Sequence, residues 1–150
     1  MIANFFQNLS RHGIQYLLIS GQATVLYGAA TFSEDIDLWL HPTEDNCSRF
    51  LAALRDRVAR YYKLTPPLTA EHLARGHGFH FVLPGRDEPD AFLDVMGAPP
   101  RVGSFPAALA EARSMDSEWG QLPTLGLRSL VDLKKTQRAR CSTVSGGVSL

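Results

Sequence analysis

The segment Asp35–Leu40 most constrains how this chain can fold. Its letters, DIDLWL, place apolar residues between Asp35, Asp37 and Trp39, and Pro42 stops the pattern. Because successive side chains of a strand point to opposite faces, the alternation predicts a β-strand with one apolar and one acidic face. The chain must therefore build a sheet, one surface of which holds two carboxylates close together.

Hydrophobic periodicity predicts further helices and strands on both sides of this segment. Helices are expected from Ile2 to the stop at Gly13, at Gln22–Tyr27, Thr43–Tyr62, Phe105–Arg113 and Arg128–Arg140. Strands are expected at Ile14–Ile19, Asp35–Leu40, Phe79–Leu83 and Ala91–Met96, the last two as a hairpin across residues 84–89. In the helix Thr43–Tyr62, Val58 belongs to the apolar stripe, and Phe92 is expected to be a core aromatic residue. The pattern is typical of an α/β or α+β fold.

Length and composition limit the function classes. The 150 residues predict one domain, residues 1–140, followed by a flexible tail of residues 141–150. Fifteen basic and fifteen acidic residues balance, which argues against a protein that binds long nucleic acids through bulk positive charge. Cys47 and Cys141 do not form a disulfide framework. We expect a cytoplasmic protein without a signal peptide or membrane segment.

Asp35 and Asp37 are candidate metal ligands. Like charges on one strand face repel each other unless a cation lies between them, and Mg²⁺ is commonly bound by one or two carboxylates plus phosphates. The alternative is an edge strand whose acidic face is only solvated. Trp39, on the same face, is the aromatic residue that could stack a base or line a cleft.

A second candidate site is the turn Ser20–Gly21 between a strand and a helix. Backbone N–H groups at a helix start can bind an anion, and glycine lets a phosphate approach the backbone. Ser20 adds a hydroxyl donor. Such turns also occur for geometric reasons alone, so this motif gains weight only beside the acidic strand.

Taken together, the Ser20–Gly21 turn and the segment Thr31–Asp37, which ends in Asp-Ile-Asp, resemble the nucleotidyltransferase superfamily with its DNA polymerase beta-like fold. The likeness is greatest to minimal bacterial nucleotidyltransferases and to the abortive-infection toxin type. It implies a small mixed β-sheet flanked by helices, an α+β (α/β-like) nucleotidyltransferase fold.

The resemblance also implies roles for particular residues. Asp35, Asp37 and Asp94 would bind two Mg²⁺ (or Mn²⁺) ions, and Asp94 would help to deprotonate the acceptor. The phosphates of a nucleoside triphosphate would be bound by Ser20, Gly21, Ser33 and Lys134. His80, on the strand that pairs with that of Asp94, would border the site. Zinc binding by the histidines around His77 is not favoured, because no further ligand stands at zinc-site spacing.

The expected reaction is transfer of a nucleoside monophosphate from a triphosphate to a hydroxyl of a protein, an RNA or a small molecule. The chain could be the toxin of a toxin–antitoxin pair, with an antitoxin partner, and a homodimer is another open assembly. The sequence departs from the family pattern at Ser20, which replaces a glycine, at Thr31, which replaces an arginine, and after Arg140, where a Ser/Gly tail follows in place of further helix. The departure at Thr31 and the short C-terminal part keep an alternative open. In that alternative the chain is a catalytically degenerate module that binds a nucleotide or a partner protein.

Overall fold

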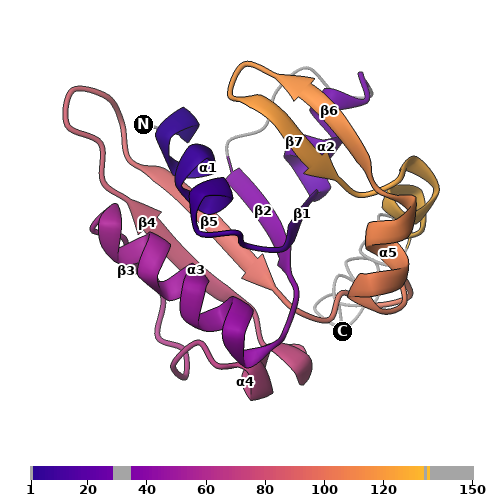
Figure 1. The fold of residues 1–150 in the computed structure, drawn as a ribbon, viewed down its shortest axis with the longest axis horizontal. Helices are drawn as coiled ribbons and strands as arrows, with labels where there is room; N and C mark the ends of the chain where they lie inside the picture. Colours follow the sequence, from indigo (N-terminus) through magenta and orange to yellow (C-terminus); the bar gives the residue numbers. More distant parts are fainter. Residues whose placement is uncertain (1, 29–34, 134, 136–150) are drawn as a thin grey trace, which may run out of the picture.

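The computed structural model describes residues 2–28, 35–133 and 135, which form one mixed sheet with helices on both faces (Figure 1). The helices are α1 (Ile2–Arg11), α2 (Ser20–Leu26), α3 (Glu44–Asp56), α4 (Ala70–Ala74) and α5 (Phe105–Glu111), and residues 127–133 are also helical. The strands are β1 (Tyr16–Ile19), β2 (Asp35–Leu40), β3 (Arg60–Tyr61), β4 (Phe79–Leu83), β5 (Ala91–Met96), β6 (Arg113–Ser117) and β7 (Gly120–Thr124).

The sheet has seven strands in the order β3-β4-β5-β2-β1-β7-β6. β2 lies at its centre, antiparallel to β1 and parallel to β5. β4 and β5 form the expected antiparallel hairpin, and β1 pairs in parallel with β7. A mixed sheet flanked by helices is the α+β (α/β-like) architecture predicted from the sequence, so the fold class is confirmed.

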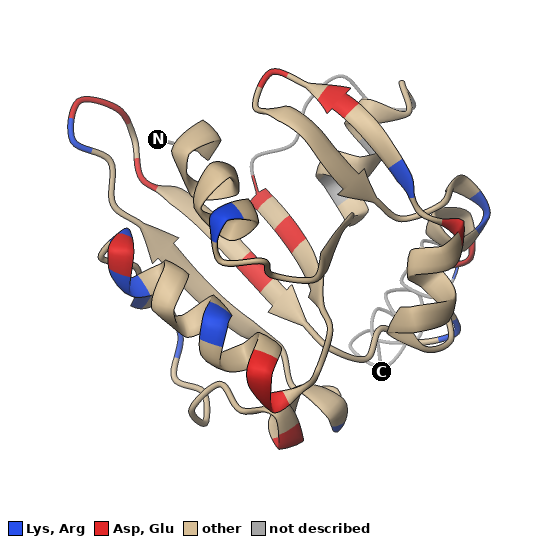
Figure 2. Cartoon of the chain, in the orientation of Figure 1, with Lys and Arg blue, Asp and Glu red and all other residues tan. Residues whose placement is uncertain are grey.

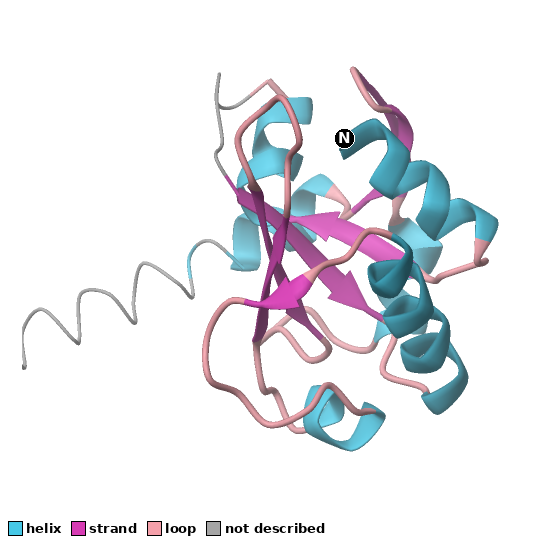
Figure 3. Cartoon of the chain, turned by 90° about the vertical axis from the view of Figure 1, so that its left-hand side faces the viewer, coloured by secondary structure: helices cyan, strands magenta, loops and turns pink. Residues whose placement is uncertain are grey.

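Two apolar clusters lie on the opposite faces of the sheet. The first packs Phe5 of α1 and Phe50 of α3 against strand side chains that include Leu18 of β1 and Leu38 of β2. The second joins Leu17, Ile19 and Trp39 to α2, α5 and helix 127–133. Figure 3 shows α1 and α3 together on one side of the strands. The second cluster covers mainly the β1 part of its face; of the acidic side chains of β2, Asp35 is exposed and Asp37 is half-buried.

The longest expected helix ends earlier than its apolar pattern predicts. α3 ends at Asp56 rather than Tyr62, because Val58 adopts a left-handed backbone (φ 55°) and the Ala59 N–H donates to the carbonyl of Leu54 at 3.0 Å. Val58 is 70% exposed, so its expected place in the apolar stripe is wrong. The chain instead turns into β3, which pairs with β4 at the sheet edge.

The hairpin β6–β7 was not expected from the sequence. The helix predicted at Phe105–Arg113 ends at Glu111, and Arg113 begins β6. β6 has no fully buried residue and β7 contains a proline, so neither shows the apolar alternation typical of strands. Within the described ranges, no helix is long and apolar enough to cross a membrane.

Candidate active site

The turn between β1 and α2 keeps a glycine-type geometry although it begins with serine. Ser20 has φ 61°, in the left-handed region that glycine enters without steric cost. The residue before it, Ile19, is extended and offers no side-chain cap to the start of α2. Ser20 therefore has a backbone conformation that glycine would adopt without strain.

Four residues on four neighbouring strands form one row across the centre of the sheet. Ile19 is the register partner of Asp37, Asp37 of Asp94, and Asp94 of His80. Register partners project from the same face, so both carboxylates lie beside the residue that leads into Ser20. Figure 2 shows the acidic positions of β2 and β5 next to each other. We call Ile19, Asp37, Asp94 and His80 the acidic row.

Asp94 is held by a neighbour within this row. Its Oδ1 contacts Nδ1 of His80, and the two side chains are 32% and 29% exposed. Contact with one carboxylate oxygen fixes the rotamer and leaves the second oxygen for another partner. Asp35 lies two residues before Asp37 on the same face and is exposed. The structure thus brings Asp35, Asp37 and Asp94 to one surface.

The aromatic pair of Tyr62 and Phe92, beside the acidic row, was not predicted from the sequence. Phe92 is the register partner of Asp35, is 36% exposed, and meets Tyr62 edge-to-face at a centroid distance of 4.9 Å. The expectation that Phe92 is a core residue is therefore wrong. Phe92 and Asp94 have the same parity in β5, so the alternation rule used for β2 would have placed Phe92 on the acidic face.

Trp39 lies on the acidic face as predicted, but it does not line a cleft. Its side chain is 1% exposed, packs edge-to-face on Phe105 at 5.6 Å, and donates its indole N–H to the carbonyl of Gly97 at 3.1 Å. Trp39 therefore belongs to the second apolar cluster and cannot stack a base in this conformation.

The donor set of the acidic row suits a hard cation. Carboxylate oxygens are preferred ligands of Mg²⁺, which usually keeps several waters and takes one or two protein carboxylates. No group of three or more His, Cys, Asp or Glu side chains is arranged to hold a metal ion within the described residues. A metal here would therefore depend on oxygen atoms from the substrate or from water.

Some of the predicted phosphate ligands cannot be placed. Ser33 and Lys134 lie outside the described residues, as does Thr31. Gly21 is the second residue of α2. Helix 127–133, which precedes Lys134, packs Leu130 and Leu133 into the second apolar cluster. Two cavities, of about 880 and 720 Å³, are lined by none of the residues of the acidic row.

No protein-family model matches the sequence, and no curated protein is significantly similar to it. A solved structure is similar across the whole chain: the crystal structure of a protein from Thermotoga maritima described as a "putative nucleotidyltransferase". The TM-score is 0.62 at 12% identity, and the match covers 99% of this chain and 90% of the other. The chain has a nucleotidyltransferase fold. At this identity the likeness concerns the fold, so the roles of individual residues must be argued from the chain itself.

Proposed function

We propose that this protein is a metal-dependent nucleotidyltransferase that uses a nucleoside triphosphate as its substrate. The observation that carries the proposal is the acidic row, in which the register places Asp37 and Asp94 side by side next to the turn at Ser20. A carboxylate pair and a strand-to-helix turn at one point of the sheet are what a metal-bound triphosphate needs.

In this proposal Asp35, Asp37 and Asp94 bind Mg²⁺ or Mn²⁺ together with oxygen atoms of the substrate and of water, and Ser20, Gly21, Ser33 and Lys134 contact the phosphates. When bound, the metal would offset the negative charge of the triphosphate and lower the pKa of the attacking hydroxyl. The contact with His80 keeps Asp94 oriented toward the face on which the substrate would lie.

The proposed reaction forms a bond between an acceptor hydroxyl oxygen and the α-phosphorus, and breaks the bond from that phosphorus to the β-phosphate oxygen. Pyrophosphate leaves, and the hydroxyl proton passes to Asp94 or to water. Tyr62 and Phe92 expose aromatic surface beside Asp35 and can stack a planar group of the nucleotide or the acceptor. A protein or RNA acceptor, a toxin role and a cytoplasmic location are parts of the proposal that follow from the family resemblance.

The test compares the wild type with Asp37→Asn, which keeps the side-chain shape and removes the charge. Each labelled triphosphate is incubated with the protein and MgCl₂, and pyrophosphate release and Mg²⁺-dependent nucleotide binding are both measured. We expect Asp37→Asn to lower the rate by at least about a hundredfold, since electrostatic stabilisation of a transition state is commonly that large. Asp116→Asn is the matched control, because Asp116 is an exposed strand aspartate on β6, beyond β7 and β1 from β2.

The outcomes separate the enzyme from the binding module. Pyrophosphate release that depends on Asp37 but not on Asp116 supports the enzyme. Nucleotide binding without release supports the degenerate module, an alternative favoured by the lack of a third grouped metal ligand among the described residues. Absence of both would contradict the proposal.

A further inference from the structure

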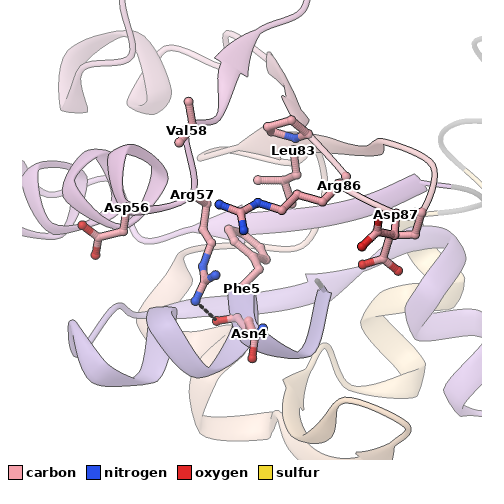
Figure 4. Close-up of a pocket in the computed structure, with 11 residues that line it drawn as sticks. Asn4, Phe5, Asp56, Arg57, Val58, Leu83, Arg86 and Asp87 are labelled. Atoms are coloured by element: carbon pink, nitrogen blue, oxygen red, sulfur yellow. Dashed lines mark hydrogen bonds between the residues drawn. The ribbon is translucent and has the colours of Figure 1, made fainter.

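A cavity of about 880 Å³ lies between the start of α1, the turn after α3 and the β4–β5 turn (Figure 4). Its volume falls in the range of small-molecule sites. The lining combines apolar side chains, including Phe5 and Leu83, with two arginines, Arg57 and Arg86. None of the residues proposed for nucleotidyl transfer contributes to it.

The two arginines come from different elements and face the same space. Figure 4 shows Arg86 extending from the hairpin toward Arg57, and Phe5 lines the same cavity. Neither arginine forms a salt bridge within the described part of the chain. Two positive charges that line one cavity repel each other, and an anion between them would reduce that repulsion.

Arg57 carries a further sign of an absent partner. Its Nε is buried and has no hydrogen-bond partner among the described residues, and its Nη2 donates to the carbonyl of Asn4 at 3.5 Å. Buried N–H groups are nearly always satisfied, so an orphaned one calls for a water, an ion or a ligand. The adjacent Asp56 does not fill this role, because its carboxylate accepts from Asn8 at 3.1 Å and contacts His12 at 2.8 Å.

The backbone at the rim of the cavity is strained at Val58. Val58, a lining residue, is 70% exposed and has φ 55°, a conformation that β-branched residues rarely adopt. Strain of this kind concentrates at ligand sites. On the other side, Gly85 donates its N–H to Asp90 at 2.9 Å, which closes the loop that carries Arg86.

The remaining charges limit the ligand. Asp87 and Glu88 also line the cavity, and in Figure 4 Asp87 lies on the far side from Arg57. Two carboxylates at the rim disfavour a polyanion, whereas a single compact oxyanion can lie between the guanidinium groups. The apolar side chains would then contact the uncharged part of the same molecule.

We infer that this cavity binds a small amphipathic oxyanion, a carboxylate or phosphate monoester with an apolar body, between Arg57 and Arg86. The site is separate from the acidic row and does not depend on the proposed function. Arginine suits both head groups, because its planar fork donates two parallel hydrogen bonds to either oxyanion.

The test is isothermal titration of the full chain with benzoate and with phenyl phosphate, two probes that distinguish the head groups. We expect saturable binding of at least one probe and none of benzyl alcohol. Arg57→Gln and Arg86→Gln should each weaken binding about tenfold, as expected for loss of one charge-assisted partner. Arg75→Gln is the control, since Arg75 pairs with Glu71 on α4 and is absent from the cavity lining.

Circular dichroism confirms that each variant is folded before its binding is compared. Two control experiments distinguish this site from the proposed nucleotide site. Asp37→Asn should leave probe binding unchanged, and ATP should not displace the probe. The inference is overturned if neither probe binds, if Arg75→Gln weakens binding as much as the other variants, or if ATP competes.

Discussion

Three of the described non-glycine residues, Ser20, Val58 and Arg101, have left-handed backbone conformations, and the first two lie at the two candidate sites. Ser20 has φ 61° beside the acidic row, and Val58 has φ 55° at the cavity rim. Serine tolerates this region better than a β-branched residue, whose two γ substituents crowd the backbone. The strain at Val58 should therefore be measurable as lost stability.

We expect Val58→Gly to raise the free energy of unfolding by about 1 kcal/mol, because relief of strain exceeds the extra entropy of glycine in the unfolded chain. Urea denaturation at constant pH measures the change. Val131→Gly is the control: Val131 is also exposed but lies in helix 127–133, where glycine should destabilise. A destabilised Val58→Gly variant would contradict this account.

Cys47 provides a second prediction at the level of one side chain. Its side chain is buried between α3 and the sheet, and burial raises the pKa of the Cys47 thiol to about 11. Since the thiolate is the reactive form, Cys47 should not react with Ellman's reagent near about pH 8 until the protein unfolds. The measurement uses Cys141→Ser, so that a single thiol is counted. Rapid labelling of the native protein would show that this part of the core opens.

Among the elements, α1 and α3 are joined by a polar contact that depends on pH. Hydrogen bonds from His12, and then from Asn8, hold the pKa of Asp56 below its ordinary value. A carboxyl with a lowered folded-state pKa adds stability above its unfolded pKa, and this stability is lost as the pH falls through the folded value.

Asp56→Asn should therefore be less stable than the wild type near about pH 7, and the difference should shrink as the pH falls below about 4. Urea unfolding across this range measures it. Asp116→Asn, an exposed strand aspartate, should show no comparable convergence. A difference that stays constant with pH would show that Asp56 acts through packing alone.

The sequence predicted the central elements well and the peripheral ones poorly. β2 and the β4–β5 hairpin were predicted at their observed bounds, because β2 and β5 alternate in sequence and β4 is a short apolar run next to a turn. β6, β7 and α4 were missed: these elements are short and mostly exposed, and their pairing or packing is set by tertiary contacts. The alternation in β2 predicted its acidic face. Which residues lie next to each aspartate depends on the strand register, which only the structure gives. The pairing of His80 with the strand of Asp94 followed from the predicted hairpin, whereas the exposed position of Phe92 was not predicted.

For the whole molecule, the sheet separates two apolar clusters, of which the second contains Trp39 and the first has Trp119 packed against it. Trp119 stacks on Phe6 at 5.7 Å against the first cluster, and Trp39 packs on Phe105 in the second. Both clusters share the strands β1 and β2, so the predicted single domain should unfold as one cooperative unit.

Trp39→Phe and Trp119→Phe leave one fluorophore each and report on one cluster each. Urea midpoints followed by fluorescence and by circular dichroism should coincide within each variant, although the midpoints of the two variants can differ. A separate transition for the cluster that contains Trp39 would mean that α5 and helix 127–133 unfold independently.

The parallel pairing of β2 with β5 also determines when, during folding, Asp37 and Asp94 come together. Asp37 and Asp94 are neighbours in the sheet, although four elements separate them in the sequence: α3, β3, α4 and β4. Contacts of such long sequence separation form late and slowly, since the loop entropy must be overcome first. We therefore expect a partly folded chain to lack the carboxylate pair, so that binding of the proposed metal ion would indicate that the sheet is complete.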